Sequence, residues 1–269
     1  RNTTTPGLSA ERVLGVDAAY NLRYGDFKAR ISGYYTRIYD QSKVISYYDD
    51  VAATFTNFAM SGIDKVHFGL EAAVSIPIYH TLALNGAVSW GQYTYDSNPY
   101  YLQTQDNSGD IVSDGYVYWK DFRVESTPQT AVNVGLSWRS NNNIYLSADF
   151  NYYNNMYLSM SPIYRTDAVI TGGMAPGDIE HLRRQEKFDS AYTLNASIGK
   201  NWYIHRKYTL GFSLDVKNIL NNQDIKTGGY EQTRLSKNTE TTVTTYQAFD
   251  SKYFYMFGTT YYLNLYFRF

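Results

Sequence analysis

Residues 12–24 read RVLGVDAAYNLRY, and residues 27–35 read FKARISGYY. In the first stretch the even positions after residue 12 hold apolar or aromatic side chains, and the odd positions are mostly small or polar, such as Arg23. The second stretch alternates in the same way. Alternation with a period of two is typical of a strand that has one apolar face. Gly25 and Asp26 between the stretches favour a tight turn, so the sequence predicts a long antiparallel hairpin.

The same alternation recurs about ten times along the chain. The expected strands cover residues 12–24, 27–36, 66–76, 81–91, 117–124, 130–138, 144–152, 188–198, 208–216 and 261–269. Most runs hold about ten residues or more, whereas strands of soluble domains usually hold ~5–6. About ten tilted residues cross the ~25 Å apolar band of a membrane. Strand length therefore favours a sheet that spans a membrane.

The links between these strands fall into two length classes. The short links are residues 25–26, 77–80, 125–129, 139–143 and 202–207, and the long ones are residues 41–64, 96–115, 158–187 and 221–250. In an up-and-down barrel, successive links lie at opposite ends of the sheet. We therefore expect the short links at one end and the long links at the other, as in outer-membrane barrels with short periplasmic turns and long extracellular loops.

Composition excludes several classes of protein. The chain has 269 residues, a formal net charge of -1, no cysteine and a mean hydropathy of -0.44. The charge gives no electrostatic case for a nucleic-acid partner, and the lack of cysteine excludes disulfides and thiolate metal sites. No window approaches the ~20 apolar residues of a transmembrane helix, but alternating strands keep the average polar. We expect an all-β fold, an antiparallel up-and-down transmembrane β-barrel with about ten strands present; the alternative is a secreted all-β domain.

Aromatic residues are abundant, and Tyr alone occurs 29 times. One group is expected near the short links: Tyr24, Phe27, Trp138, Trp202, Tyr203 and Phe269. A second group is expected toward the long links: Tyr34, Tyr35, Trp90, Tyr93, Tyr152 and Tyr153. Two aromatic girdles at the membrane–water interfaces would have this arrangement. The alternative is that Tyr and Trp are simply good strand formers.

Four further segments carry recognisable patterns. They are residues 258–269 (GTTYYLNLYFRF), 215–223 (DVKNILNNQ), 123–138 (RVESTPQTAVNVGLSW) and 8–11 (LSAE). The first is similar to a terminal strand that the outer-membrane assembly machinery reads, and the other three resemble parts of TonB-dependent receptors of the outer membrane. These parts are the family's penultimate-strand pattern, its Pro-containing periplasmic turn with the following strand, and the lead-in to a barrel strand. The Tyr-rich strands and Asn-rich turns are similar to those of Bacteroidetes members.

The resemblance implies a fold and a set of partners. Family members have a 22-stranded barrel with an amino-terminal plug, so residues 1–269 would be the carboxy-terminal half of the barrel, without the plug and the first strands. The implied location is the bacterial outer membrane. The implied partners are outer-membrane lipid, the protein's own plug and amino-terminal strands, the TonB complex and a small-molecule, glycan or peptide ligand. A surface lipoprotein is an optional partner in Bacteroidetes relatives.

The polar sides of the strands carry charges at a few positions. Candidates that would face a lumen or a plug are Arg30, Glu71, Asp149, Asp215 and Lys217. The alternative is that any water-facing wall carries mixed charges. The histidines (His67, His80, His181 and His205) lie in separate hairpins, and no nucleophile elbow or phosphate-binding loop occurs. We therefore expect no catalytic residue, no metal and no cofactor.

Aromatic residues also gather in and beside the long links. The candidates for ligand binding are Tyr47, Tyr48, Tyr100, Tyr101, Tyr116, Tyr118 and Trp119. Rigid aromatic surfaces bind sugars, peptides and flat ligands with little loss of entropy. The alternative is that these side chains only pack the loops against each other.

The expected function is active uptake of a nutrient such as a siderophore, glycan, peptide or cofactor, through a TonB-dependent receptor. One alternative is a self-contained ten-stranded outer-membrane barrel enzyme, which would need acidic and His residues gathered at the rim. The other is a passive porin or an adhesin, which would need no plug.

Overall fold

The computed structural model describes residues 4–50, 52–125, 127–172, 179–180, 183–205, 207–238 and 245–269. Within these residues most of the chain is β-strand, and helix is confined to short segments such as η1 (Ile163–Arg165) and α1 (Asp167–Thr171). No helix in these ranges is long and apolar enough to cross a membrane. The expectation of an all-β fold is confirmed.

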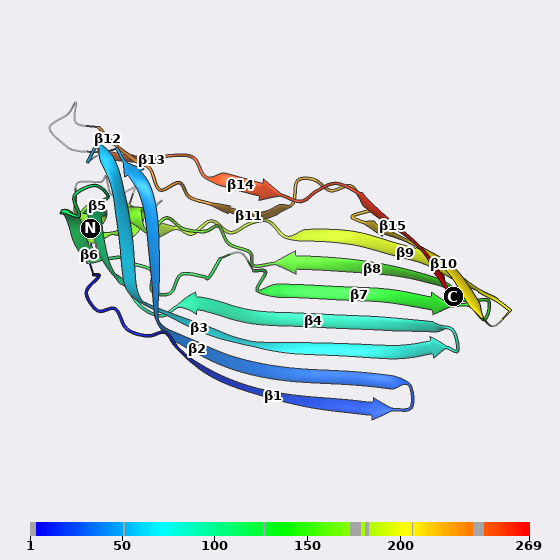
Figure 1. Ribbon diagram of the computed structural model, residues 1–269. Helices are drawn as coiled ribbons and strands as arrows, with labels where there is room; N and C mark the ends of the chain where they lie inside the picture. The colour runs from blue at the N-terminus through cyan, green and yellow to red at the C-terminus, as the bar shows by residue number, and fades with distance from the viewer. Residues whose placement is uncertain are drawn as a thin grey trace.

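Nine strands follow one another in a single antiparallel sheet (Figure 1). They are β1 (Arg12–Tyr24), β2 (Phe27–Asp49), β3 (Thr54–Tyr79), β4 (Leu82–Tyr95), β7 (Thr130–Arg139), β8 (Ile144–Asn154), β9 (Ala191–Ile204), β10 (Tyr208–Lys217) and β15 (Thr260–Arg268). Each strand pairs with the next in this order, so the path runs up and down. β1 pairs only with β2, and β15 only with β10, so the described residues form an open sheet and not a closed barrel.

The two classes of link lie at opposite ends of the sheet, as expected. The short links, residues 25–26, 80–81, 140–143 and the described residues 205 and 207, share one end with the C-terminus, and the long connections share the other end with the N-terminus (Figure 1). We call the first the short-link end. We call the long connections together the cap, which comprises residues 41–63, 96–129, 155–190 and 218–259 within the described ranges.

The strand expected at residues 117–124 is absent, which corrects the count from about ten strands to nine along the sheet. β4 pairs directly with β7, from Leu82 opposite Trp138 to Trp90 opposite Thr130. Residues 117–124 make only isolated bridges, such as Thr94 with Arg123. The physical reason is that successive links of an up-and-down sheet lie at opposite ends. The links expected at residues 125–129 and 139–143 follow one another, so they cannot both lie at the short-link end. The link at residues 125–129, of which Ser126 lies outside the described residues, therefore belongs to the cap and is not a short-link turn.

The loop expected at residues 41–64 is mostly strand. β2 and β3 continue beyond the sheet as a hairpin whose paired residues run from Gln41 and Ile63 to Asp49 and Thr54. Register shifts around residues 38–43 mark a bulge, where Asp40 has a φ of 61°. Asp is one of the few residues that tolerate this left-handed conformation, so the bulge redirects the hairpin away from the sheet.

Shorter strands extend the cap. β5 (Tyr100–Gln105) pairs with β3, and β6 (Ile111–Tyr116) pairs with β5. β11 (Lys226–Tyr230) pairs with β14 (Lys252–Tyr255), and β12 (Leu235–Asn238) pairs with β13 (Thr245–Ala248). These pairs are the reason why the long connections have a defined structure of their own.

The hydrophobic core lies in the cap and not behind the sheet. The larger cluster of buried side chains contains Phe58, Tyr101, Trp119, Met160 and Tyr164 together with neighbours from the same connections. The smaller cluster surrounds Leu158 and Phe188. The body of the sheet contributes little to either cluster, so its two faces are available to partners.

Candidate functional site

The register of the sheet decides which side chains share a face. Residues directly opposite each other in an antiparallel pair project to the same side, and neighbours along a strand project to opposite sides. One row from β3 to β15 is apolar throughout: Ile76, Leu84, Leu136, Ala148, Ala196, Val216 and Tyr261. Another runs from β1 to β9: Tyr20, Ile31, Ala72, Val88, Val132, Tyr152 and Tyr192. We call this side the apolar face and the other the polar face.

The apolar face is uncovered. Leu70, in the interior of the sheet, is 56% exposed, and Leu265, on the edge strand, is 70% exposed. Soluble monomers rarely expose a contiguous apolar patch larger than a few hundred Å². Burial of one large aliphatic side chain contributes about 1.5–3 kcal/mol, and this face repeats such side chains on every strand of the sheet. The face is therefore suited to contact with an apolar partner.

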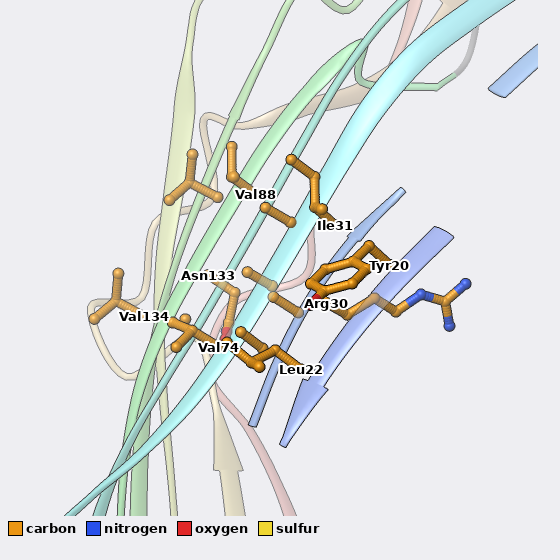
Figure 2. A pocket seen from close by; sticks show the side chains of 14 residues that line it. Tyr20, Leu22, Arg30, Ile31, Val74, Val88, Asn133 and Val134 are labelled. Carbon is orange, nitrogen blue, oxygen red and sulfur yellow. The ribbon is translucent and has the colours of Figure 1, made fainter. Parts of the chain in front are cut away.

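A hollow interrupts the apolar face where small residues meet across the strands. It has a volume of about 490 Å³, and its lining includes the small residues Ala72 and Gly86. Tyr20 and Ile31 lie on one side of it (Figure 2). Figure 2 also shows the guanidinium of Arg30, a residue of the polar face, extending away from these apolar side chains. The hollow therefore offers almost only hydrocarbon surface to whatever covers the face.

Aromatic residues gather at both ends of the apolar face. Near the short links these are Tyr24, Phe27, Trp138, Trp202 and Phe267, and toward the cap they are Tyr35, Phe68, Trp90, Tyr152 and Tyr192. Four residues assigned to the girdles lie instead on the polar face because their positions have the other parity: Tyr34, Tyr93, Tyr153 and Tyr203. Of these, the Tyr34 and Tyr93 hydroxyls share a hydrogen bond of 2.6 Å.

The five charges expected on one side do share the polar face. Arg30 lies opposite Asn21 and Ala73, and Glu71 lies opposite Ser32. Asp149 lies opposite Gly135 on β7, and both Asp215 and Lys217 project from the corresponding side of β10. That these residues face a lumen or a plug stays a prediction.

Between these charges the polar face carries short hydrogen-bonding side chains. Asn133 Nδ2 donates to Asn151 Oδ1 at 2.9 Å, and Asn151 in turn donates to the Thr193 hydroxyl at 3.4 Å. The hydroxyls of Ser147 and Ser197 lie 2.7 Å apart. These side chains interact across neighbouring strands, so this face is suited to water or to a polar partner and not to hydrocarbon.

The predicted ligand-binding aromatics divide into two groups. Tyr47, Tyr101 and Trp119 are buried in the cap, and Tyr101 and Trp119 are only 1% and 2% exposed. Tyr101 stacks on Phe58 at 4.6 Å between ring centroids. As placed, these three rings pack the loops together, which is the alternative that the sequence left open.

The other predicted aromatics reach the surface of the cap. Tyr48, Tyr116 and Tyr118 are exposed, and Tyr100 meets Tyr116 edge to face at 5.8 Å between ring centroids. The Tyr100 hydroxyl donates to Asp114 at 2.6 Å, which raises the pKa of Tyr100 to about 12. These four residues offer aromatic surface to a ligand from outside, and their role in binding stays a prediction.

Tyr47 and Tyr101 also line a cap pocket of about 340 Å³. Gln103 Nε2 donates there to Asp49 Oδ2 at 2.5 Å and to the Tyr47 hydroxyl at 3.1 Å. Burial, followed by the charge of Asp49, raises the pKa of Tyr47 above its ordinary value. Nothing in the sequence pattern indicated Gln103, because it lies 56 residues from Tyr47 in the chain.

Ion pairs that the sequence reasoning missed join the long connections. Arg165, 1% exposed, makes a bidentate pair with Glu231 at 2.5 and 2.9 Å. Arg234 pairs with Asp50 at the tip of the β2–β3 hairpin, at 2.9 Å. No local signal could have found these pairs, because their partners are 66 and 184 residues apart.

The sequence predicted no metal and no catalytic residue, and for the residues that the structure describes these stay predictions. No group of three or more His, Cys, Asp and Glu side chains within them could hold a metal ion. His67 packs against Tyr93 on the polar face, with ring centroids 4.8 Å apart and the two rings tilted relative to each other. His181 lies outside the described residues. No protein-family model matches this chain, and no curated protein matches it either.

Proposed function

We propose that this chain is part of the wall of a transmembrane β-barrel in a bacterial outer membrane, and that the protein takes up a nutrient actively as a TonB-dependent receptor. One observation carries the membrane proposal: a continuous, uncovered apolar face runs across the antiparallel sheet, with aromatic residues at both ends. Lipid tails would cover that face without a second layer of protein, and the polar face would line the interior.

The strands are long enough for this. β1 has 13 residues, β8 has 11 and β7 has 10, whereas about ten tilted residues cross the apolar band of an outer membrane. The cap would then lie outside the cell and the short links in the periplasm. This is the arrangement of short and long links that outer-membrane barrels share.

The direction of the edge strands supports further barrel strands. With nine strands running alternately up and down, β1 and β15 point the same way (Figure 1). Closure of this sheet on itself would need a parallel pair, whereas bacterial single-chain barrels are antiparallel with an even number of strands. Each unsatisfied backbone group in hydrocarbon costs about 2–7 kcal/mol, so unpaired strand edges are strongly unfavourable in a membrane. An odd number of additional strands, as in a 22-stranded barrel, would satisfy both edges.

Active transport is the further step of the proposal. It is supported by the resemblance of the terminal strands to TonB-dependent receptors and by the exposed aromatics of the cap, which suit capture of a small molecule, glycan or peptide. The TonB complex would supply energy through a plug inside the barrel. A surface lipoprotein remains an optional partner on the cap side.

The test uses cells that produce the native protein containing this chain. Growth on single nutrients, with and without the protein, identifies the nutrient, and uptake of its radiolabelled form is then measured with and without a functional TonB complex. We expect surface binding to persist and uptake to stop when TonB is lost. Uptake that continues without TonB would support a passive porin instead.

A second measurement separates the proposal from a self-contained barrel. The chain has no cysteine, so Val16→Cys and Leu265→Cys can be combined on the two edge strands. Disulfide formation between them in the native envelope would mean that β1 and β15 meet, which contradicts the proposal of intervening strands. The pair Val16→Cys and Tyr35→Cys, whose parent residues face each other in β1 and β2, is the positive control.

A further inference from the structure

A lysine projects from the apolar face near the short links. Lys200 on β9 lies opposite Ile144, the first residue of β8, and opposite Phe212 on β10. In the paired strands of the sheet outside the cap, the other basic side chains on this face lie toward the cap: Arg12 and Arg37. Lys200 is therefore a charge within a row of apolar side chains, on the face that the proposed function assigns to lipid.

Lys200 differs from the two arginines in its partners. The arginines are neutralised by carboxylates: Arg12 by Asp40 at 2.8 Å and Arg37 by Asp96 at 2.7 Å. Lys200 takes part in no ion pair within the part of the chain that the structure describes. Its Nζ lies 5.2 Å from the ring centroid of Trp202, two positions nearer the turn, so the side chain extends toward the short-link end. Lysines near the ends of membrane-spanning segments reach the headgroup level in this way.

A second lysine reaches the same side of the sheet. Lys207 Nζ lies 5.3 Å from the ring centroid of Tyr208, which is opposite Ile204 on the apolar face. Among the described residues Lys207, like Lys200, has no acidic partner within ion-pair distance. Contact with a ring face leaves the N–H donors of an ammonium group available to an anion. The β9–β10 hairpin therefore presents two uncompensated positive charges on the apolar face, next to its turn.

Aromatic rings adjoin the two lysines on this face. Trp202 packs against Phe212 with ring centroids 5.9 Å apart, and Tyr208 stacks on Phe267 of β15 at 5.8 Å. We call these four residues the aromatic platform. Trp202 and Phe267 are exposed, so the platform is open to a partner from outside the sheet. A molecule that carries both a negative group and a long apolar part would contact the lysines and the platform together.

The sequence around the lysines contains no acidic residue. Residues 127–148, 190–214 and 258–269 hold no Asp or Glu; they contain β7, β9 and β15 and the short-link ends of β8 and β10. Their other Arg and Lys residues are Arg139 and Arg268, which project to the polar face, and Arg206, which lies outside the described residues. A partner with net negative charge is therefore favoured here, whereas the ammonium group of a zwitterionic headgroup would be repelled.

We infer that the β9–β10 hairpin binds a phospholipid of net negative charge, with its phosphate at Lys200 and Lys207 and its acyl chains on the aromatic platform. In the proposed function the short links lie in the periplasm, so this lipid belongs to the inner leaflet. The inference rests on the membrane part of the proposed function and adds a partner of defined charge to it. It does not depend on transport.

Native mass spectrometry of the purified native protein that contains this chain tests the inference. The protein, in micelles of an uncharged detergent, is titrated with phosphatidylglycerol or with phosphatidylcholine that has the same acyl chains. We expect lipid adducts at lower concentrations of phosphatidylglycerol. Lys200→Gln and Lys207→Gln should each weaken phosphatidylglycerol binding about fivefold, the contribution of one lysine at an anionic surface. Lys200→Arg keeps the charge and should keep the preference, and unchanged phosphatidylcholine adducts show that each variant is folded.

Lys28→Gln is the matched control, because Lys28 lies at the same end of the sheet but projects to the polar face, opposite Arg23. Its phosphatidylglycerol binding should equal that of the unaltered protein. Equal binding of the two lipids by the unaltered protein, or the same loss in Lys28→Gln as in Lys200→Gln, would overturn the inference and leave the membrane wall intact. The proposed function fails by a different result, a protein that stays folded and monomeric after complete removal of detergent.

Discussion

Asn133 and Val134 are adjacent on β7 and project to opposite faces of the sheet. Asn133 donates a hydrogen bond to Asn151 at 2.9 Å, whereas Val134 lies between Gly86 and Phe150 on the apolar face and is 46% exposed. One step along the chain therefore separates a polar environment from one that, in the proposed barrel, is lipid. This pair offers a direct test of which face touches the membrane.

Val134→Arg should destabilise the protein in a bilayer by about 2–4 kcal/mol, the cost of a cation on a lipid-facing strand near mid-membrane. Asn133→Arg should cost about 1 kcal/mol, the loss of one hydrogen bond. Urea unfolding of the native protein and of each variant in phospholipid vesicles measures both changes in the free energy of unfolding. Equal costs for the two variants would contradict the assignment of faces.

The sequence predicts the sheet well because alternation is a local signal. Each strand shows its own apolar side, and the parity of positions such as Arg30 and Glu71 then places them on the polar face without any knowledge of their neighbours. The pattern fails where strand pairing decides the structure. Residues 117–124 contain suitable residues for a strand, but β7 takes the place beside β4.

The cap could not be predicted for a related reason. Its structure depends on contacts between distant segments, such as Arg165 with Glu231 and Gln103 with Tyr47. Aromatic content alone could not separate Tyr101, which is buried, from Tyr116, which is exposed. The sequence therefore placed these aromatics in the long connections but did not show which rings are free to make contact, and ligand capture by them stays a prediction.

A close contact on the polar face makes Gly69 sensitive to substitution. A Cβ at this position would lie 2.5 Å from the Trp90 carbonyl oxygen and 2.5 Å from the Tyr34 hydroxyl. Gly69→Ala should therefore destabilise the sheet by about 1–3 kcal/mol through overpacking. Gly15→Ala, whose Cβ would meet only Thr36 at 3.7 Å, is the matched control and should be nearly neutral. Vesicle unfolding measures both, and equal stability of the two variants would mean that β3 and β4 are less closely packed at this point.

The buried ion pair of the cap should be costly to break on one side only. Glu231→Gln leaves the Arg165 guanidinium buried without its counter-charge, which typically costs about 3–5 kcal/mol. We expect faster hydrogen exchange in residues 161–167, measured by mass spectrometry. Glu180→Gln is the control, because its contact with Arg184 is 3.9 Å long and 80% exposed at both side chains, so exchange should not change. Equal protection in the two variants would show that Arg165 finds another partner.

The contact between Asp50 and Arg234 gives a pH dependence with a defined sign. The hydrogen bond from Arg234 lowers the pKa of the Asp50 carboxyl below its ordinary value of 3.8. A lowered carboxyl pKa contributes stability at pH values above 3.8, and that contribution is lost as the pH falls through the folded-state value. Spin labels at Ala52→Cys and Ser236→Cys should therefore report a narrow distance distribution at neutral pH that broadens in acid below 3.8. Asp50→Asn should give the broad distribution already at neutral pH, and a narrow one would show that other contacts of the cap hold β12 near the hairpin tip.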